Sequence, residues 1–300
     1  MISIAMATYN GAKYIREQID SILFQTIRDF ELVVCDDYSS DDKVSVLKEY
    51  AQKDSRIHVY ENEQNLGFKK NFENAISKST GDYIALCDQD DIWLPDHLET
   101  LISEMRDDAQ IVCGKPIFVN ENNEELPDKY DYFMMYHPPV SNEDTVRHIF
   151  LGRSTYQGAS MLIRKSFFDK ALPIPDGAYY HDSWFAILAC FMEGFVFVDK
   201  PTMRYRRFSD SVTFGDIRIS AAKRFCASIL YDYTTKDRLA LIDGIRSRAK
   251  YLTPDMESLL DKMEKMIRRG SSLWGRIANV PYKIRHFKAI FACDIKHLFS

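Results

Sequence analysis

The sequence predicts an α/β protein in which a mostly parallel central sheet is flanked by helices, followed by a helical extension at the C-terminus. Three observations support this fold class. Short apolar runs alternate with segments of helical periodicity, each run ends in polar turn-forming residues, and no strand pattern follows residue 215. Strands that alternate with helices form right-handed βαβ units on a parallel sheet. We therefore expect one domain over residues 1–214 and a helical extension over residues 215–300.

Four strands and three helices are expected in the N-terminal part of this domain. The apolar runs that predict strands cover residues 2–7, 31–35, 56–60 and 83–87. Residues 15–23, 44–50 and 68–76 repeat apolar side chains at helical spacing, and Asn10 is the expected N-cap of the first helix. Polar clusters follow these strands, at the edge of a parallel sheet where ligands bind. This coincidence is the first indication of function.

The middle of the chain mixes both kinds of element. We expect short strands over residues 111–118, 160–164 and 195–198, a helix over 181–193, and polar loops around 120–145. From about residue 217 the pattern is wholly helical.

The composition is that of an ordinary globular protein, with 46% hydrophobic and 28% charged residues. No apolar run reaches the roughly 18 residues that a membrane-spanning helix needs, and the N-terminus lacks the basic region of a signal peptide. We therefore expect a cytoplasmic protein. Its six cysteines form no CxxC pair and are expected to be small buried hydrophobic residues, not a disulfide or zinc framework. They are Cys35, Cys87, Cys113, Cys190, Cys226 and Cys293.

Charge is distributed unevenly along the chain, whose net charge is −5. Residues 262–300 contain nine Lys or Arg and two acidic residues, so they carry +7 and residues 1–261 carry −12. An acidic body with a basic tail indicates two different kinds of partner. We expect no nucleic-acid partner, because the acidic body would repel phosphates.

Two common nucleotide-binding motifs are missing. A GxGxxG turn uses glycines so that the backbone can approach a pyrophosphate, but only Gly11 follows the first predicted strand. The phosphate loop GxxxxGK[ST] is also absent from the sequence. These absences argue against an NAD-dependent oxidoreductase and against a P-loop ATPase.

Asp88, Gln89 and Asp90 follow the fourth predicted strand. Two carboxylates at i and i+2 after a buried strand can hold one hard divalent cation such as Mg²⁺ or Mn²⁺, which prefers oxygen ligands. Such a cation neutralises the leaving oxygen of a substrate diphosphate. A solvated acidic turn is the alternative interpretation of these residues alone. The surrounding stretch, Gly81–Pro95, favours the metal site.

Four stretches of the chain resemble the motifs of family 2 glycosyltransferases in order and spacing: Ile4–Gly11, Val33–Asp41, Asn65–Gly67 and Gly81–Pro95. The resemblance extends to about residue 214 and is nearest to bacterial rhamnosyltransferase-like members. It implies a GT-A nucleotide-sugar-binding fold and an inverting mechanism.

The resemblance also implies roles in donor binding. Thr8, Tyr9 and Asn10 would line the nucleotide pocket, and either Asp36 or Asp37 would accept the imide N–H of uracil or thymine. The alternative for the aspartate pair is an Asx-type turn with solvated acids.

The same resemblance implies a diphosphate site beside this pocket. Asp88 and Asp90 would flank the donor diphosphate and its Mn²⁺ or Mg²⁺, with Asp90 as the more direct ligand. Asn65 and Gly67 would belong to the nucleotide site, although a helix-capping loop explains them nearly as well.

An inverting transferase needs a carboxylate that takes the proton of the acceptor hydroxyl as its oxygen attacks the anomeric carbon. The resemblance implies that this base is Asp182, because relatives carry (E/H)-D-x-W where this chain has Tyr179–Trp184. The helix dipole stabilises a carboxylate in the first turn of a helix, and simple capping is the alternative role. His181 is expected to be a spectator, and Gly158–Met161 resembles the acceptor-side strand of the family.

One stretch departs from the family pattern. Relatives often carry Tyr-Arg-x-His, whose His can complete the metal shell, where this chain has Tyr205–Phe208. Phe208 has no metal-binding atom. Either the third protein contact to the metal is missing, or Arg206 or Arg207 neutralises the diphosphate instead.

These features predict an inverting, metal-dependent hexosyltransferase. It would move one sugar from a UDP- or dTDP-sugar to a glycan or lipid-linked acceptor in cell-surface polysaccharide synthesis. A non-catalytic nucleotide-sugar-binding scaffold and a nucleotidyltransferase are the alternatives. We expect a non-processive enzyme, because the QxxRW motif of processive relatives and their membrane-spanning helices are both missing.

The basic tail interleaves Lys and Arg with large apolar residues over 268–277 and 282–291. Such segments can bind a bilayer interface, with the apolar side chains in the lipid and the cations at anionic headgroups. A helical cap packed on the catalytic domain, or on the second subunit of a homodimer, is the alternative. We expect contact with the inner face of the cell membrane, where lipid-linked acceptors are presented.

We predict that the full chain co-sediments with anionic liposomes and is released by high salt, because each basic residue near an anionic surface contributes about 1 kcal/mol. A chain truncated near Lys262 should stay in the supernatant. Equal, salt-insensitive sedimentation of both proteins would favour the packed cap or the homodimer.

Overall fold

The computed structural model describes residues 1–126, 141–150, 156–178, 180–208, 235–271 and 279. Contacts divide the chain into two compact units. The first is formed by Met1–Pro175 with Tyr179–Arg207, and the second by Asp176–Ala178 with Phe208–Ser300. The domain boundary expected near residue 215 lies outside the described residues.

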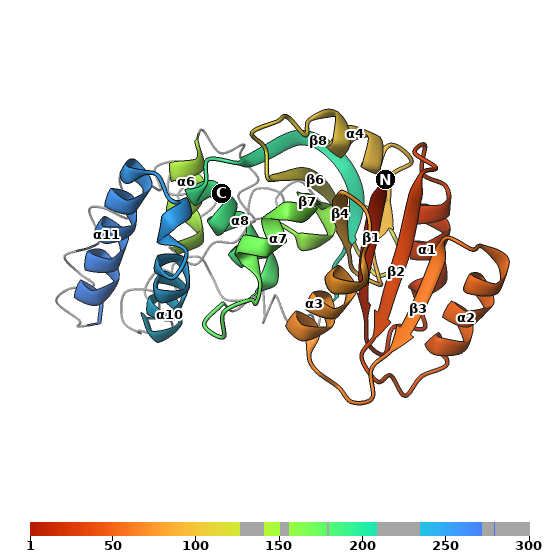
Figure 1. Cartoon of the computed structure of the whole chain (residues 1–300). Helices are drawn as coiled ribbons and strands as arrows, with labels where there is room; N and C mark the ends of the chain where they lie inside the picture. The colour runs from red at the N-terminus through yellow and green to blue at the C-terminus, as the bar shows by residue number, and fades with distance from the viewer. Residues whose placement is uncertain (127–140, 151–155, 179, 209–234, 272–278, 280–300) are drawn as a thin grey trace, which may run out of the picture. The chain divides into compact units, whose positions relative to one another are not determined.

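A mixed sheet forms the framework of the first unit (Figure 1). Among the described residues its strand order is β3-β2-β1-β4-β7-β6-β8-β5. The strands are β1 (Ile2–Thr8), β2 (Phe30–Asp36), β3 (Ile57–Glu61), β4 (Tyr83–Cys87), β5 (Ile92–Trp93), β6 (Ile111–Val119), β7 (Met161–Arg164) and β8 (Phe195–Arg206). The pairs β1–β2, β1–β4, β2–β3 and β6–β8 are parallel, whereas β4–β7, β6–β7 and β5–β8 are antiparallel. The predicted α/β class with a mostly parallel sheet is confirmed.

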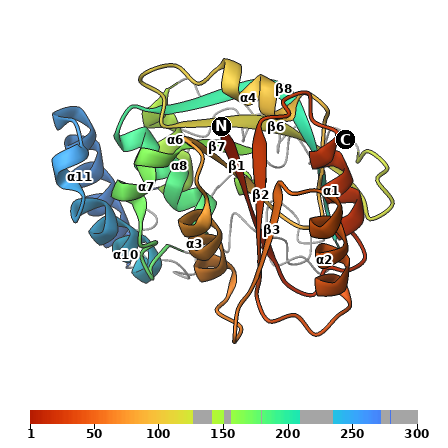
Figure 2. The same cartoon turned by 45° about the vertical axis from the view of Figure 1, so that its right-hand side comes forward.

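Helices cover both faces of the parallel strands. The helices of the first unit are α1 (Ile15–Leu23), α2 (Lys43–Lys53), α3 (Phe68–Lys78), α4 (His97–Ser103), α6 (Asn142–Phe150), α7 (Lys165–Ala171) and α8 (His181–Phe191). Figures 1 and 2 show α1 and α2 on one side of β1, β2 and β3, and α3 on the other side. Helical crossovers between parallel strands produce this layering.

The central strands are apolar along nearly their whole length because both of their faces are covered. Every residue of β2 is buried, as are all residues of β1 except Ala7. On α1, Ile15, Ile19 and Ile22 are fully buried at the spacing of one helical face. Each such side chain contributes about 1.5–3 kcal/mol when it leaves water. This packing fixes the strand ends from which the polar loops begin.

The predicted N-cap at Asn10 is wrong. Helix α1 begins at Ile15, and Tyr14 occupies the N-cap position without a side-chain capping bond. Asn10 lies in the left-handed region, with φ at 45°, and its Oδ1 accepts from the Ser40 N–H (3.0 Å). The side chain therefore joins two loops instead of capping a helix, because the chain makes a further turn before α1 starts.

The middle of the first unit contains more structure than the sequence pattern predicts. Strand β8 continues past the expected end at residue 198 to Arg206, because its second half pairs with both β6 and β5. The strand expected from residue 160 begins at Met161, since Gly158–Ser160 form a 3₁₀ turn. Helix α6 occupies part of a stretch expected as loop, and β5, α4 and α7 are short elements that tertiary contacts stabilise.

The second unit is helical as far as it is described. It contains α10 (Thr235–Arg246) and α11 (Pro254–Arg269). The Thr253 hydroxyl caps α11 by accepting from the Met256 N–H (3.4 Å), and a proline stands at the start of this helix. Most of the basic tail, where membrane or subunit contact is expected, lies outside the described residues.

The cysteines agree with the expectation wherever they are described. Cys35, Cys87, Cys113 and Cys190 are free and buried, and burial raises the pKa of the Cys35 thiol to about 11. Cys226 and Cys293 lie outside the described residues. Among the described helices, none combines the length and hydropathy that crossing a membrane requires.

Glu31 joins the starts of three neighbouring strands from a buried position. Its Oε1 accepts from the Ser3 hydroxyl (2.5 Å), the Thr80 N–H (2.6 Å) and the Thr80 hydroxyl (2.8 Å). Burial raises the pKa of a carboxyl group, but here these hydrogen bonds outweigh burial and hold the pKa of Glu31 below 4.5. The ionised form is therefore the one that stabilises the fold.

We predict that Glu31→Gln lowers the free energy of unfolding at pH 7 by about 1–3 kcal/mol, the scale of hydrogen bonds to a charged group. Because the folded pKa is depressed, the stabilisation is present above pH 4.5 and is lost as pH falls through the folded pKa. Denaturant unfolding of both proteins at pH 7 and pH 3.5 measures this. A gap between them that is equal at both pH values would contradict the role of the charge.

Candidate functional site

The loops after β1, β2 and β4 lie together because these strands are parallel neighbours. Thr8 at the end of β1 is in register with Asp36 at the end of β2, and the Asp37 N–H donates to the Thr8 carbonyl (2.9 Å). Met6 is in register with Cys87, the last residue of β4. The fold therefore brings the first, second and fourth sequence motifs to one edge of the sheet.

Asp36 is buried, and protein groups surround its carboxylate. Oδ1 accepts from the hydroxyls of Thr8 (3.0 Å) and Ser39 (2.8 Å) and lies 3.1 Å from Lys43 Nζ, while Oδ2 accepts from the Ser39 N–H (2.9 Å). Burial raises the pKa of Asp36, but the contacts with Ser39 and Lys43 outweigh it and hold that pKa below its usual value. The Thr8 hydroxyl is thus turned toward Asp36, inside the protein.

Asp37 organises the motif around Asn65 and Gly67. Its Oδ1 accepts from the Leu66 N–H (2.8 Å) and from Asn62 Nδ2 (2.9 Å), and its Oδ2 accepts from the Gly67 N–H (2.9 Å). Asn65 Nδ2 donates to the Asp37 carbonyl (3.2 Å). Gly67 stands before α3 with φ at 79°, a conformation that favours glycine. Asp37, Asn65 and Gly67 therefore belong to one hydrogen-bonded loop.

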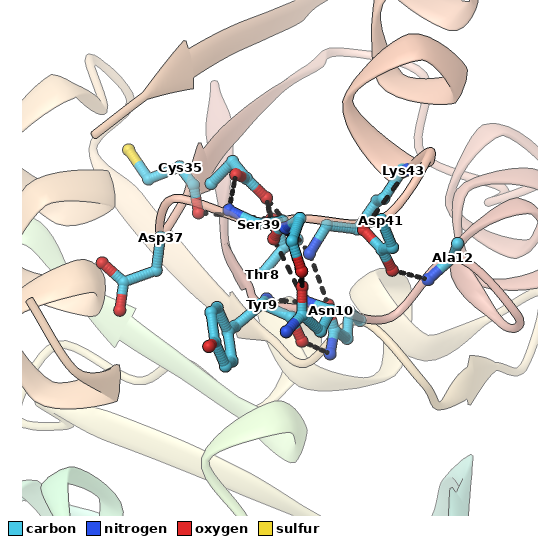
Figure 3. A network of polar contacts seen from close by, with 12 residues as sticks. Thr8, Tyr9, Asn10, Ala12, Cys35, Asp37, Ser39, Asp41 and Lys43 are labelled. Carbon is cyan, nitrogen blue, oxygen red and sulfur yellow. Dashed lines mark hydrogen bonds and ion pairs between the residues drawn. The ribbon is translucent and has the colours of Figure 1, made fainter. Parts of the chain in front are cut away.

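Aromatic side chains are exposed where β1 and β2 end. The Tyr9 side chain is half exposed, and Tyr38 is 63% exposed with φ at 61°, an uncommon backbone conformation for a bulky residue. Figure 3 shows Tyr9 and Asp37 on one side of these loops, and Asp41 and Lys43 on the other. The first side carries the Tyr9 ring and the Asp37 carboxylate, the combination of an aromatic surface and a hydrogen-bond acceptor that would suit a nucleoside.

Gln89, between the two predicted metal ligands, is held by the loop after β1. Its Oε1 accepts from the Tyr9 N–H (2.9 Å) and from Lys43 Nζ (3.1 Å), and its Nε2 donates to the Tyr9 carbonyl (2.8 Å). Gly11 makes this close approach possible, because a Cβ at residue 11 would lie 2.2 Å from Gln89 Cδ. The motif Asp88–Asp90 is thus tied to the nucleotide-side loop.

The aspartates around Gln89 lie in an environment that opposes their charges. Burial, together with the charges of Asp90 and Asp182, raises the pKa of Asp88 to about 7. Burial also raises the pKa of Asp90, although Arg206 counteracts it. Asp91 Oδ1 accepts from the Arg206 N–H (2.9 Å), whereas its buried Oδ2 has no partner, and burial raises its pKa well above the usual value. Positive charge is therefore favoured here.

Arg206 is almost completely buried and engages three protein groups. It donates from Nε to the Asp90 carbonyl (2.8 Å), from Nη1 to the Glu121 carbonyl (2.8 Å) and from Nη2 to Glu17 Oε2 (2.6 Å). Its guanidinium also lies 4.5 Å from the centre of the Tyr14 ring. The structure thus places Arg206 against the backbone of the Asp88–Asp90 loop, and its contact with a diphosphate stays a prediction.

Asp182 lies in the first turn of α8, which begins at His181. Burial raises the pKa of Asp182 to about 6, although hydrogen bonds from Ser183 and from the backbone of Gly158 oppose this. The Asp182 charge contributes to the raised pKa of Asp88, after burial and Asp90, so the two carboxylates are near enough to interact electrostatically. Tyr180 occupies the N-cap position, and its side chain does not cap the helix. Asp182 is therefore available for chemistry beyond capping.

His181 is buried among aromatic rings beside Asp182. Its ring stacks on Phe72 with 4.2 Å between centroids, neither ring nitrogen has a hydrogen-bond partner, and burial lowers its pKa to about 3. In the adjacent acceptor-side stretch, Ser160 is buried and donates to the Gln157 carbonyl (3.0 Å). Only Gly158 of that stretch therefore contacts Asp182 through a hydrogen bond.

The carboxylates of Asp88 and Asp90 suit a divalent cation. Carboxylate oxygens are hard ligands, no other described residue donates a hydrogen bond to either group, and burial next to each other leaves their charges uncompensated. Within the described residues, no cluster of three or more His, Cys, Asp or Glu side chains forms a complete metal site. A cation held by this pair would take its remaining ligands from substrate oxygens and water.

The sequence pattern did not assign a role to three residues that lie at this edge of the sheet. Lys43, Gln89 and Asp91 are held at this edge by contacts between distant segments. For Gln89, its position in the sequence between two candidate metal ligands indicated that it would lie at the site. Lys43 and Asp91 gave no such indication, because a charged residue next to an acidic run usually faces solvent.

Solved structures with this architecture are glycosyltransferases of the GT-A type. Residues 1–349 of S. aureus TarS in complex with UDP-GlcNAc superpose with a TM-score of 0.59 at 16% identity, covering 95% of this chain and 91% of that one. The mannosyltransferase PcManGT from Pyrobaculum calidifontis, in complex with GDP-Man and Mn²⁺, gives a TM-score of 0.53 at 14% identity, covering 93% and 86%. At these identities the likeness shows the fold, and it confirms the expected GT-A class.

Sequence comparison identifies the family. The family described as Glycosyl transferase family 2 matches residues 3–172, more than half of the chain, so the protein belongs to it. The chain is 35% identical over 183 residues to the uncharacterized glycosyltransferase MJ1057 of Methanocaldococcus jannaschii, covering 56% of this chain and 62% of that protein. It is 36% identical over 124 residues to the UDP-Glc:alpha-D-GlcNAc-diphosphoundecaprenol beta-1,3-glucosyltransferase WfgD of Escherichia coli, covering 41% and 48%. These matches span less than two thirds of either relative.

Proposed function

We propose that the protein transfers one sugar, with inversion, from a UDP- or dTDP-sugar to a glycan or lipid-linked acceptor in polysaccharide synthesis. The proposal rests on Asp88, Asp90 and Asp182, which are near enough to interact: burial, together with the charges of Asp90 and Asp182, raises the pKa of Asp88. Carboxylates kept in such an unfavourable arrangement mark functional sites. Membership of a glycosyltransferase family supports the reaction class.

Asp182 acts as the general base in the proposed reaction. With a pKa of about 6, it is ionised at neutral pH and still accepts a proton effectively. It removes the proton of the acceptor hydroxyl while that oxygen attacks the anomeric carbon, and the bond from this carbon to the diphosphate breaks. The nucleoside diphosphate leaves with the electron pair, so a single displacement inverts the anomeric centre.

Asp88 and Asp90 hold the donor diphosphate through Mn²⁺ or Mg²⁺. The cation supplies positive charge to the leaving diphosphate. This chain would contribute two carboxylates. Arg206 holds the loop that carries them by donating from Nε to the Asp90 carbonyl (2.8 Å). PcManGT was solved with Mn²⁺, which is consistent with this assignment.

Asp37 is the better candidate to accept the base imide N–H. Its Oδ2 accepts one hydrogen bond, from Gly67 (2.9 Å), and a carboxylate oxygen can accept a second. Asp36 is already contacted by Thr8, Ser39 and Lys43. A hydrogen-bond acceptor at this position would favour uracil or thymine, whose imide N–H is a donor.

The acceptor class is proposed from a relative and from the tail. The name of the relative WfgD describes transfer of glucose to a GlcNAc that is linked to diphosphoundecaprenol. A lipid-linked acceptor would place the protein at the cytoplasmic face of the membrane, where the basic residues of 262–300 would meet anionic headgroups. A homodimer contact through the same tail is the alternative outcome.

We predict that Asp90→Ala abolishes sugar transfer and removes the stabilisation that UDP or dTDP gives in the presence of Mn²⁺, because one of two cation ligands is lost. Thermal unfolding with nucleotide and Mn²⁺, and nucleoside diphosphate release from a panel of nucleotide-sugars, measure the two effects. Asp107→Ala, an exposed aspartate remote from the site, is the matched control. Full activity of Asp90→Ala in EDTA would exclude the metal role.

We predict that Asp182→Asn lowers kcat by about 10²–10⁴-fold, the usual scale for a lost general base, and leaves the donor Kd within about twofold. In the unsubstituted enzyme kcat should rise with pH through about 6, because Asp182 is protonated and inactive below that value. Rapid-quench turnover from pH 5 to 8 and donor titration separate the two effects. If donor affinity collapsed while bound complex still reacted, Asp182 would be structural.

A further inference from the structure

Lys43 occupies a position that ordinary helix chemistry does not explain. It is completely buried, although lysine is rarely buried without a compensating partner. It is also the first residue of α2, where the helix dipole disfavours a cation. A residue that violates two local preferences at once must be compensated by specific contacts.

Those contacts lie on two different loops. Lys43 Nζ is 3.1 Å from Asp36 Oδ1 at the end of β2 and 3.1 Å from Gln89 Oε1 in the loop after β4. Figure 3 shows Lys43 behind the loop that carries Ser39 and Asp41, on the side away from Asp37. One ammonium group therefore connects the nucleoside-side acids to the Asp88–Asp90 loop.

The ammonium group reinforces the orientation of the Gln89 amide. Two backbone bonds of Tyr9 set that orientation, because Oε1 accepts from the Tyr9 N–H (2.9 Å) and Nε2 donates to the Tyr9 carbonyl (2.8 Å). Lys43 Nζ, which carries only donors, faces the same amide oxygen at 3.1 Å. Lys43 therefore adds a third bond that holds the Gln89 side chain in this position.

We propose that Lys43 is a positioning residue that acts through Gln89 to hold Asp88 and Asp90 ready for the metal–diphosphate group. The inference rests on the proposed function, because it assumes that this pair binds a cation. Gln89 is covalently between the two aspartates, so fixing its side chain fixes the backbone from which both carboxylates project. Residues that orient metal ligands typically change metal affinity about 10–100-fold when they are lost.

The test measures Mn²⁺ affinity directly, from the electron paramagnetic resonance signal of free Mn²⁺, with and without UDP. Lys43→Met and Gln89→Met should each weaken Mn²⁺ binding about 10–100-fold. The double variant should bind no more weakly than Gln89→Met alone, because Lys43 acts through that side chain.

Two further variants control for folding. Lys43→Met leaves Asp36 buried without its cation, so Asp36→Asn with Lys43→Met replaces the pair by neutral groups of similar size. This variant should fold and should still bind Mn²⁺ more weakly. Gln25→Met is the matched control, because Gln25 is a buried glutamine that bonds the Leu94 carbonyl and the Leu98 N–H, and its loss should leave Mn²⁺ affinity unchanged.

The outcomes separate the inference from the function on which it rests. Unchanged Mn²⁺ affinity in folded Gln89→Met, or equal and additive losses in the double variant, would overturn the role of Lys43 while the metal site stands. Failure of the unsubstituted protein to bind Mn²⁺ even with UDP would overturn the proposed metal site, and the inference with it.

Discussion

Repulsion between carboxylates at one edge of the sheet is the constraint on which the rest of the site depends. Parallel strands β1, β2 and β4 end side by side, and acidic residues follow two of them. The fold compensates this charge with two buried cations: Lys43 pairs with Asp36, and Arg206 binds the backbone of the Asp88–Asp90 loop. Neither cation can be removed without leaving buried negative charge unpaired.

The carboxylates at this edge are not compensated equally: Asp36 and Asp37 are bonded by other protein groups, whereas, in the part of the chain that the structure describes, Asp88 and Asp90 are not. Asp36 and Asp37 accept hydrogen bonds from surrounding segments and so fix the backbone where β1 and β2 end. Asp88 and Asp90 receive no such bonds from other residues among those described, and burial raises their pKa values. In the proposed function, a cation and the donor diphosphate would satisfy these two carboxylates, whereas Asp36 and Asp37 are satisfied by the protein itself.

Much of this arrangement follows from the sequence, because it rests on local patterns. Apolar runs ending in polar residues predict strands β1, β2 and β4 and the edge of the sheet at which Asp36 and Asp88 both lie. The contacts of Lys43 were not predictable, since the residue pattern of α2 gives no reason to bury its first side chain. The continuation of β8 to Arg206 was missed for a similar reason: pairing with β5 and β6 creates it. Non-local contacts decide such features, and a single sequence does not display them.

The close fit between Gly11 and Gln89 limits how the loop after β1 can diversify. Any side chain at residue 11 would collide with the Gln89 amide, whereas the Tyr9 side chain is exposed and can vary. In a combinatorial library built to change donor preference, codon 9 would therefore supply more useful diversity than codon 11. Codon 11 would mostly generate inactive members, and the recovery of glycine there after selection would report how stringent the selection had been.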